Sequence, residues 1–162
     1  MPPDPDELLQ QADALAGKPG ATQADLRRAI SAAYYAMFHF CLTAAADMIC
    51  GATSRSKPQY SLVYRSVDHA RLRGLCDQLR WSKPGNVAFI PSGGFGSIAD
   101  FARNTANLYE QRISADYDPS ESYAAAGVSV LISDARKAID WFRSCTQEQQ
   151  EAFLMQLLFK SR

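Results

Sequence analysis

The longest pattern of hydrophobic positions runs from Thr22 to Cys50, without a proline or a glycine. At roughly 100° per residue, two sets of side chains fall on opposite faces of a helix. One set is Ile30, Tyr34, Met37, Cys41, Ala45 and Met48; the other is Arg28, Ala32, Tyr35, His39 and Ala46. A surface helix carries its charges on one face, whereas here the second face holds small and aromatic residues with a single Arg. We therefore expect a helix enclosed on two sides, with a partner for its second face.

Shorter amphipathic patterns predict further helices. They are expected at 5–16, at 60–80 (one helix, or two with a break near Asp68), at 97–115, at 118–144 and after Thr146. Start signals support several of them: Asp4 and Asp118 each precede a proline, Thr146 is followed by Gln149 as in a capping box, and Thr22 with Asp25 resembles one at the start of the long helix. Strand patterns are nearly absent. The sequence predicts an all-α, single domain over 1–162, most simply an up-and-down bundle of five or six helices.

Residues 82–96 differ from the helical segments in composition. They contain two prolines and four glycines around a short apolar patch. A loop of this length in a small domain tends to be functional or mobile. Its Gly-Gly-Phe-Gly run is not a phosphate loop, because no strand precedes it and no Gly-Lys-Ser/Thr follows.

Formal net charge is zero, so composition offers no general attraction to nucleic acid. The charge is uneven, however: Arg55 to Lys83 holds seven basic residues against two acidic ones. Two interpretations stay open for this segment, a solvated helix face or an approach surface for an anionic partner.

The N-terminus lacks the basic and apolar regions of a secretory signal. The most apolar run, 29–46, is rich in alanine and contains polar residues, which is unlike a membrane-spanning helix. Four cysteines without a Cys-x-x-Cys spacing are typical of reduced thiols. We expect a cytoplasmic protein without membrane contact.

Candidate chemistry is sparse. The chain has two histidines, His39 and His69, and no spacing that suggests a metal site, so we expect neither metal nor cofactor. The richest polar cluster holds Arg112, Asp116 and Tyr117, directly before the expected helix start at Asp118. One interpretation is a structural clamp, with Arg112 paired to Asp116 and Tyr117 packed on the bundle. The other is an anion site, where a helix N-terminus offers free backbone N–H groups.

Two segments resemble a known family. Leu26–His39, LRRAISAAYYAMFH, is similar to the RRA-S-AYYAMFH helix of HEPN domains, the nucleotide-binding helical domains of higher eukaryotes and prokaryotes. Leu108–Asp118, LYEQRISADYD, resembles the second signature of the small stand-alone bacterial and archaeal branch. The helix expected at 120–142 is similar to the one that follows there. The resemblance spans roughly 7–143, with 82–96 and an extra helix at 146–159 as local additions.

The resemblance implies a HEPN-like helical bundle that forms a homodimer and is often a metal-independent ribonuclease. In active members an Arg, usually followed by a polar residue, and a His four to six residues beyond it form a site across the dimer. The Arg stabilises the phosphate and the His helps activate the ribose 2′-hydroxyl, which yields a 2′,3′-cyclic phosphate and a 5′-hydroxyl. Arg112 matches the Arg, Ile113 stands at the polar position, and Tyr117 stands at the position of the His.

A phenol, with an unperturbed pKa near 10, is a weaker base at pH 7 than an imidazole near 6.5. We therefore consider other candidate bases, namely Asp116 or a side chain of the long helix, His39 or Tyr35. The expected catalytic set is Arg112, Asp116, Tyr117 and His39. Expected contacts to RNA or nucleotide are Arg28, Ser31 and Tyr35, with Arg103 and Asn104 as a second-ranked pair earlier in the same helix as Arg112.

Three functions stay open at this stage. The first is a ribonuclease or toxin component of a toxin–antitoxin or phage-defence system, with a minimal nucleotidyltransferase as antitoxin partner. The second is a catalytically inactive module that binds nucleotide, RNA or a protein partner. The third is a structural helical partner in a dimer or heteromer.

Overall fold

The computed structural model describes residues 1–81 and 87–160, which form seven α-helices and one short 3₁₀ turn without a strand in these ranges. In chain order these are α1 (Pro5–Ala16), α2 (Gln23–Cys50), η1 (Ala52–Ser54), α3 (Pro58–Tyr64), α4 (His69–Leu79), α5 (Ile98–Tyr117), α6 (Ala125–Ser144) and α7 (Gln147–Leu158). For the described residues the all-helical prediction is confirmed, with seven helices there rather than the five or six expected.

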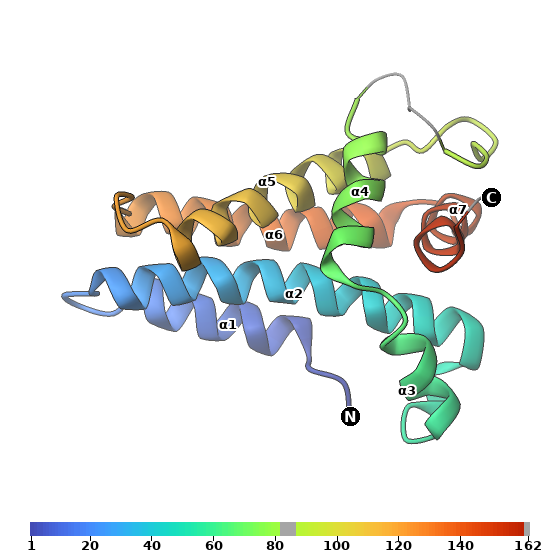
Figure 1. Cartoon of the computed structure of the whole chain (residues 1–162), viewed down its shortest axis with the longest axis horizontal. Coiled ribbons are helices and arrows are strands. Elements are labelled where there is room, and N and C mark those ends of the chain that lie inside the picture. Colours follow the sequence, from blue (N-terminus) through green and yellow to red (C-terminus); the bar gives the residue numbers. More distant parts are fainter. Residues whose placement is uncertain (82–86, 161–162) are drawn as a thin grey trace.

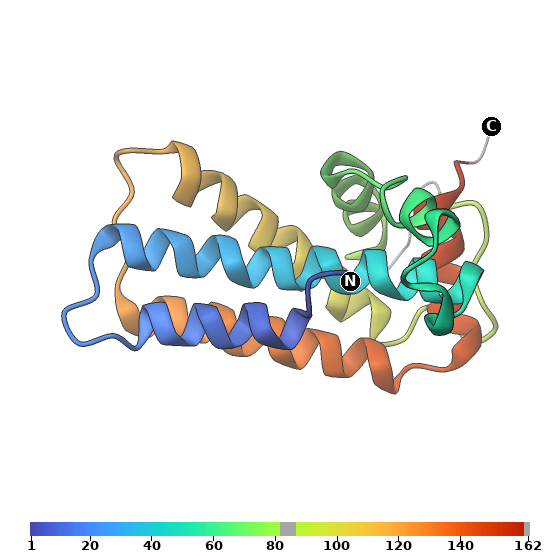
Figure 2. The ribbon, with the colours of Figure 1, turned by 90° about the horizontal axis from the view of Figure 1, so that it is seen from below.

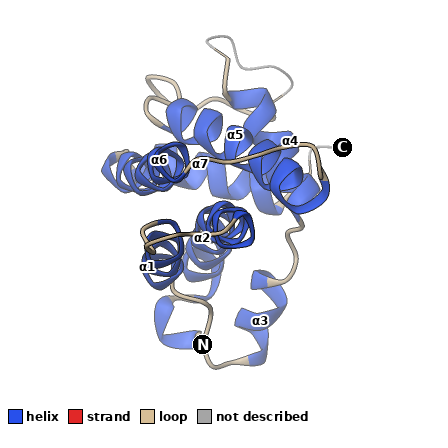
Figure 3. Cartoon of the chain, turned by 90° about the vertical axis from the view of Figure 1, so that its left-hand side faces the viewer, coloured by secondary structure: helices blue, strands red, loops and turns tan. Residues whose placement is uncertain are grey.

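Helix α2 runs through the middle of the bundle. The helices α1, α5 and α6 lie along it, whereas α3, α4 and α7 gather toward its C-terminal end (Figures 1 and 2). Seen end-on, α1 and α2 lie side by side in one layer, and α5 and α6 lie in a second layer over them (Figure 3). An up-and-down bundle thus describes the long helices, while α4 crosses them.

Burial of α2 on two sides is confirmed. Ile30, Met37 and Cys41 on the first face are fully buried, and Ala32 and Ala46 on the second face are buried as well. On the second face, Ala32 and its neighbours line a groove that α1 of the same chain completes, whereas Tyr35 and His39 also contact α5 and α3. Helix α2 is also long and apolar enough to cross a membrane by length and composition, but 78% of its most apolar window is buried inside the bundle. The core helix of a folded domain passes the same test.

Most local start signals act as predicted. Thr22 and Asp25 form a capping box on α2, as Thr146 and Gln149 do on α7. Asp68 accepts a hydrogen bond from the backbone N–H of Arg71 at 2.7 Å, and this cap separates α3 from α4. Of the predicted loop 82–96, positions 82–86 lie outside the described residues; the remainder forms loop and turns.

The predicted helix start at Asp118 is wrong, because α6 begins at Ala125. The Arg27 guanidinium donates to the backbone carbonyls of Ala115, Asp118 and Glu121 at 2.7, 2.9 and 2.6 Å. The carboxylate of Asp118 accepts from Ser120 instead of opening a helix. Two of the carbonyls that a helix from 118 would use are bound by a side chain of α2, so the segment stays a connection.

We expect Arg27→Ala to lower the free energy of unfolding by about 1–3 kcal/mol, since it leaves three carbonyls, two of them in partly buried hydrogen bonds, without their charged donor. Urea denaturation followed by circular dichroism measures this change. Arg28→Ala is the matched control, because Arg28 is the exposed neighbour on the same helix turn and surface substitutions stay within about 0.5 kcal/mol. Equal losses in the two variants would contradict the role of Arg27.

Candidate functional site

Arg112 and Asp116 of α5 contact two polar side chains of α2, Tyr35 and Ser31. Nη2 of Arg112 donates to the hydroxyl of Tyr35 at 3.2 Å. Its Nε lies 3.0 Å from Oδ2 of Asp116, an ion pair without an aligned hydrogen bond. Ser31 donates from Oγ to the other oxygen of Asp116 at 2.6 Å. The two segments Leu26–His39 and Leu108–Asp118 therefore face one another within one chain.

The guanidinium of Arg112 is held in an aromatic setting. Its Cζ lies 5.7 Å from the ring centre of Tyr34 and 5.6 Å from that of Tyr35, within range of a cation–π interaction. The side chain is only 12% exposed. Partial burial opposes the charge, but the hydroxyl of Tyr35 and the carboxylate of Asp116 outweigh it and raise the pKa of Arg112. Arg112 is thus a fixed cation close to the surface.

A groove of about 240 Å³ lies beside this cluster, between α1 and α2. Four of the predicted site residues, Arg28, Ser31, Tyr35 and His39, line this groove together with α1 and the N-terminal segment. The lining residues are Pro3, Leu8, Gln11, Leu15, Arg28, Ser31, Ala32, Tyr35 and His39. Ser31 and Tyr35 belong to the groove and also bind the Asp116–Arg112 pair, so groove and cluster are continuous.

His39 is half-buried at this groove. Its Nδ1 lies 2.6 Å from the hydroxyl of Tyr64 on α3, and its ring centre lies 6.0 Å from that of Tyr35 in a stacked arrangement. Burial, with a smaller effect of His69, lowers the pKa of His39 below its ordinary value. The imidazole is therefore neutral at pH 7, the state that a general base requires.

The structure does not bring all the predicted residues together. The clamp interpretation is half right: Arg112 pairs with Asp116, but the predicted packing of Tyr117 on the bundle is wrong, because Tyr117 is 72% exposed. Arg103 pairs with Asp100 at 2.7 Å and, with Asn104, lines a different groove that α6 completes. This second-ranked pair lies apart from the groove between α1 and α2.

His69 was not among the predicted site residues, yet it lies in the same cluster. It is the first residue of α4, and its Nδ1 is 2.9 Å from the hydroxyl of Tyr34. Its ring centre lies 4.0 Å from that of Phe38 and 5.6 Å from that of Tyr35. The one sequence signal was that the chain has only two histidines. Their meeting around Tyr35 depends on how α4 packs.

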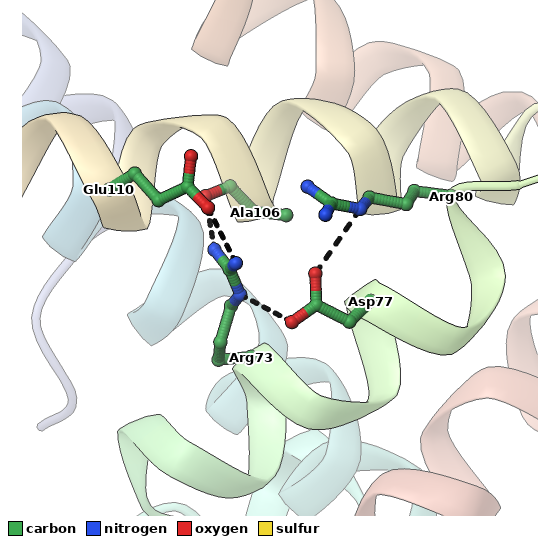
Figure 4. A network of polar contacts seen from close by, with 5 residues as sticks. All are labelled: Arg73, Asp77, Arg80, Ala106 and Glu110. Carbon is green, nitrogen blue, oxygen red and sulfur yellow. Dashed lines mark hydrogen bonds and ion pairs between the residues drawn. The ribbon is translucent and has the colours of Figure 1, made fainter.

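A polar latch fixes α4 against α5 and so relates His69 to Arg112. Arg73 of α4 donates to the backbone carbonyl of Ala106 at 2.8 Å and to the carboxylate of Glu110 at 2.6 Å (Figure 4). The same guanidinium donates to Asp77 at 2.7 Å, and Nε of Arg80 lies 3.2 Å from Asp77 (Figure 4). Arg73 lies one turn after His69 on α4, and Glu110 lies two residues before Arg112 on α5, so the latch fixes the parts of α4 and α5 that carry these two site residues against each other.

The basic segment Arg55–Lys83 is not a continuous free cationic surface. Arg55 pairs with Asp47 of α2, and Arg71 donates to backbone carbonyls at the C-terminal end of α7. Arg73 and Arg80 belong to the latch. Four of the seven basic side chains are thus engaged within the chain. These internal contacts weaken the interpretation of the segment as an approach surface for an anionic partner. Lys83 lies outside the described residues.

Within residues 1–81 and 87–160, no group of three or more His, Cys, Asp or Glu side chains could hold a metal ion. All four cysteines are free thiols, and Cys41 and Cys76 are buried. Comparisons with protein-family models, with curated proteins and with solved structures found no match.

We expect the protein to lose stability on acidification in the range in which the two histidines titrate. Burial lowers the pKa values of His39 and His69 below the ordinary 6.5 in the folded state. Their contribution to stability is therefore complete above pH 6.5 and is lost as the pH falls from 6.5 through the lowered folded values. The melting temperature at pH 7 and pH 5 measures this loss.

The double variant His39→Gln, His69→Gln should show a smaller difference between these two pH values than the wild type. If the melting temperature of the double variant falls between pH 7 and pH 5 as much as that of the wild type, other titratable groups cause the loss of stability.

Proposed function

We propose that the protein is a HEPN-type, metal-independent ribonuclease that binds a substrate phosphate at Arg112 and uses His39 as general base. One observation carries the proposal: Arg112, held by Tyr35 and Asp116, adjoins a groove that contains Arg28 and His39. This joins a fixed cation to a neutral imidazole, the two groups that 2′-hydroxyl attack on a phosphodiester needs.

Arg112 has the features of a phosphate contact. A guanidinium offers several N–H donors in a fixed fork, and here Nε and Nη2 are directed at Asp116 and Tyr35. The two N–H groups of Nη1 and the second N–H of Nη2 are then the donors left for a ligand oxygen. Because the neighbouring rings and carboxylate hold the group in place, little reorganisation is needed when charge develops on the phosphate.

His39 replaces Tyr117 in the proposed mechanism. Nδ1 faces the hydroxyl of Tyr64, so Nε2 is the nitrogen available to a 2′-hydroxyl in the groove. Arg28, exposed at the same groove, is a second contact for the RNA backbone. Asp116 acts on Arg112 and Ser31 as a positioning residue, and exposed Tyr117 contacts RNA outside the groove.

The wider setting rests on the resemblance to HEPN domains. It supports a homodimer, a nucleotidyltransferase antitoxin as partner and a role as toxin or defence component in the cytoplasm. The contact between the two resembling segments, through Ser31 with Asp116 and Tyr35 with Arg112, agrees with the proposal that one site draws on both.

A catalytically inactive module is the second candidate. It is favoured by the low exposure of Arg112, 12%, and by its existing ion pair, since both limit how far the guanidinium can turn toward a substrate. In this alternative the site binds RNA or a nucleotide without turnover.

If the enzyme hypothesis holds, the pure protein cleaves structured or transfer RNA in the presence of EDTA and leaves 2′,3′-cyclic phosphate ends. Arg112→Ala should slow cleavage by about 10²–10³-fold, the usual cost of one donor to a developing oxyanion. Gel assays with end-group analysis measure both effects. Arg136→Ala is the matched control, because Arg136 lies exposed on α6 and should keep the wild-type rate. Absence of RNA cleavage at a micromolar concentration of the wild-type protein would contradict the ribonuclease hypothesis.

The binding-module alternative predicts RNA association that weakens as salt rises, since phosphate contacts release counterions. Fluorescence anisotropy with a labelled single-stranded RNA at several KCl concentrations measures the slope. Arg28→Ala should lower the magnitude of the slope of log K against log[salt] by about 0.7, as expected for one lost contact to a single strand. An affinity for RNA that does not change with salt would contradict a phosphate contact, in the ribonuclease and in the binding module alike.

A further inference from the structure

We propose that His69 is a second phosphate ligand of the site, which donates Nε2–H to a non-bridging phosphate oxygen beside Arg112. The inference rests on the proposed function only in taking Arg112 as the position of the phosphate. It assigns a ligand contact to a residue outside both segments that resemble HEPN domains.

The first argument is that Arg112 and His69 share the same two neighbours. The Arg112 Cζ lies 5.7 and 5.6 Å from the ring centres of Tyr34 and Tyr35, and the imidazole of His69 lies 5.6 Å from each. His39 shares only Tyr35 with Arg112 among the described aromatic contacts. His69 is therefore the imidazole more closely associated with the guanidinium.

The second argument concerns which nitrogen of His69 carries the proton. The side chain of Tyr34 is fully buried, and burial raises its pKa well above the ordinary value, so the phenol stays protonated. Within the described part of the chain, Nδ1 of His69 is the acceptor within reach of this hydroxyl, at 2.9 Å. Tyr34 therefore donates to Nδ1, and a neutral His69 carries its hydrogen on Nε2. That nitrogen is a donor, as a phosphate oxygen requires.

The charges around His69 fit an anion. Partial burial and the guanidinium of Arg112 lower its pKa, against a smaller opposite effect of Asp68. His39 on α2 is neutral as well. An anion bound between Arg112 and His69 would offset the positive charge that Arg112 imposes. His69 also begins α4, a helix of 11 residues whose N-terminal end is the positive end of its dipole.

The latch between α4 and α5 keeps this geometry. Arg73 ties α4 to Ala106 and Glu110, so the backbone of α4 that carries His69 cannot shift away from α5 without breaking these contacts (Figure 4). Arg112 and His69 are therefore held as a pair of donors before a ligand binds.

The test uses a dinucleotide without a 2′-hydroxyl, which has the phosphodiester but cannot be cleaved. Long-range ¹H–¹⁵N spectra of the full chain should show His69 as the Nε2–H tautomer. Saturation with the dinucleotide should raise the pKa of His69, since a nearby anion favours the charged imidazole. His69→Gln should weaken dinucleotide binding about tenfold, the effect of one hydrogen bond to a charged group.

Two tyrosine variants form a matched pair. Tyr34→Phe releases Nδ1 of His69 and should weaken binding, whereas Tyr64→Phe releases Nδ1 of His39 and should leave the pKa change of His69 intact. If Tyr34→Phe fails to fold, the wild-type spectra still report the tautomer of His69 and the change of its pKa on binding.

The outcomes separate the two proposals. Binding that depends on Arg112, with an unchanged pKa of His69 and unchanged affinity in His69→Gln, overturns the role of His69 and leaves the proposed function standing. An Nδ1–H tautomer in the free protein overturns it as well. Binding unaffected by Arg112→Ala overturns the phosphate position itself, and the role of His69 with it.

Discussion

The enclosure of α2 is the constraint on which the rest of the structure depends. Both faces of this helix are covered in part by other helices, so several of its polar side chains, Tyr34 above all, are partly or fully removed from water. A buried polar group is costly unless it is hydrogen-bonded. Ser31, Tyr34 and His39 accordingly find partners on α5, α4 and α3. The packing of α2 thus decides which side chains of other helices must face it.

The same contacts make up the candidate site. Arg112 is held by a hydrogen bond to the hydroxyl of Tyr35, a side chain of α2. Each of the two histidines is held at Nδ1 by a tyrosine hydroxyl. Neutral imidazoles beside the partly buried cation Arg112 cost stability at acidic pH, yet neutral imidazoles are the protonation states that binding and proton transfer use. Stability and proposed chemistry therefore depend on one network, held in register by the latch at Arg73.

Several local signals were sufficient where the partner lies within one helical turn. The capping boxes at Thr22 and Thr146 and the ion pair of Arg112 with Asp116 all join residues three or four apart. The same kind of signal failed at Asp118, because Arg27 binds the carbonyls around it from a helix far away in sequence. A side chain that reaches across the bundle outweighs a cap worth about 1 kcal/mol.

The sequence by itself determined the all-helical class, the two buried faces of α2 and the neighbouring positions of Arg112 and Asp116, because helical periodicity fixes contacts at short range. Only the tertiary structure decided that His39 and His69 meet around Tyr35, that Tyr117 points to solvent, and that most of the basic segment is engaged inside the chain. Those outcomes depend on how α3, α4 and α7 cross the bundle, and a pattern within one helix carries no information about the angle at which another crosses it.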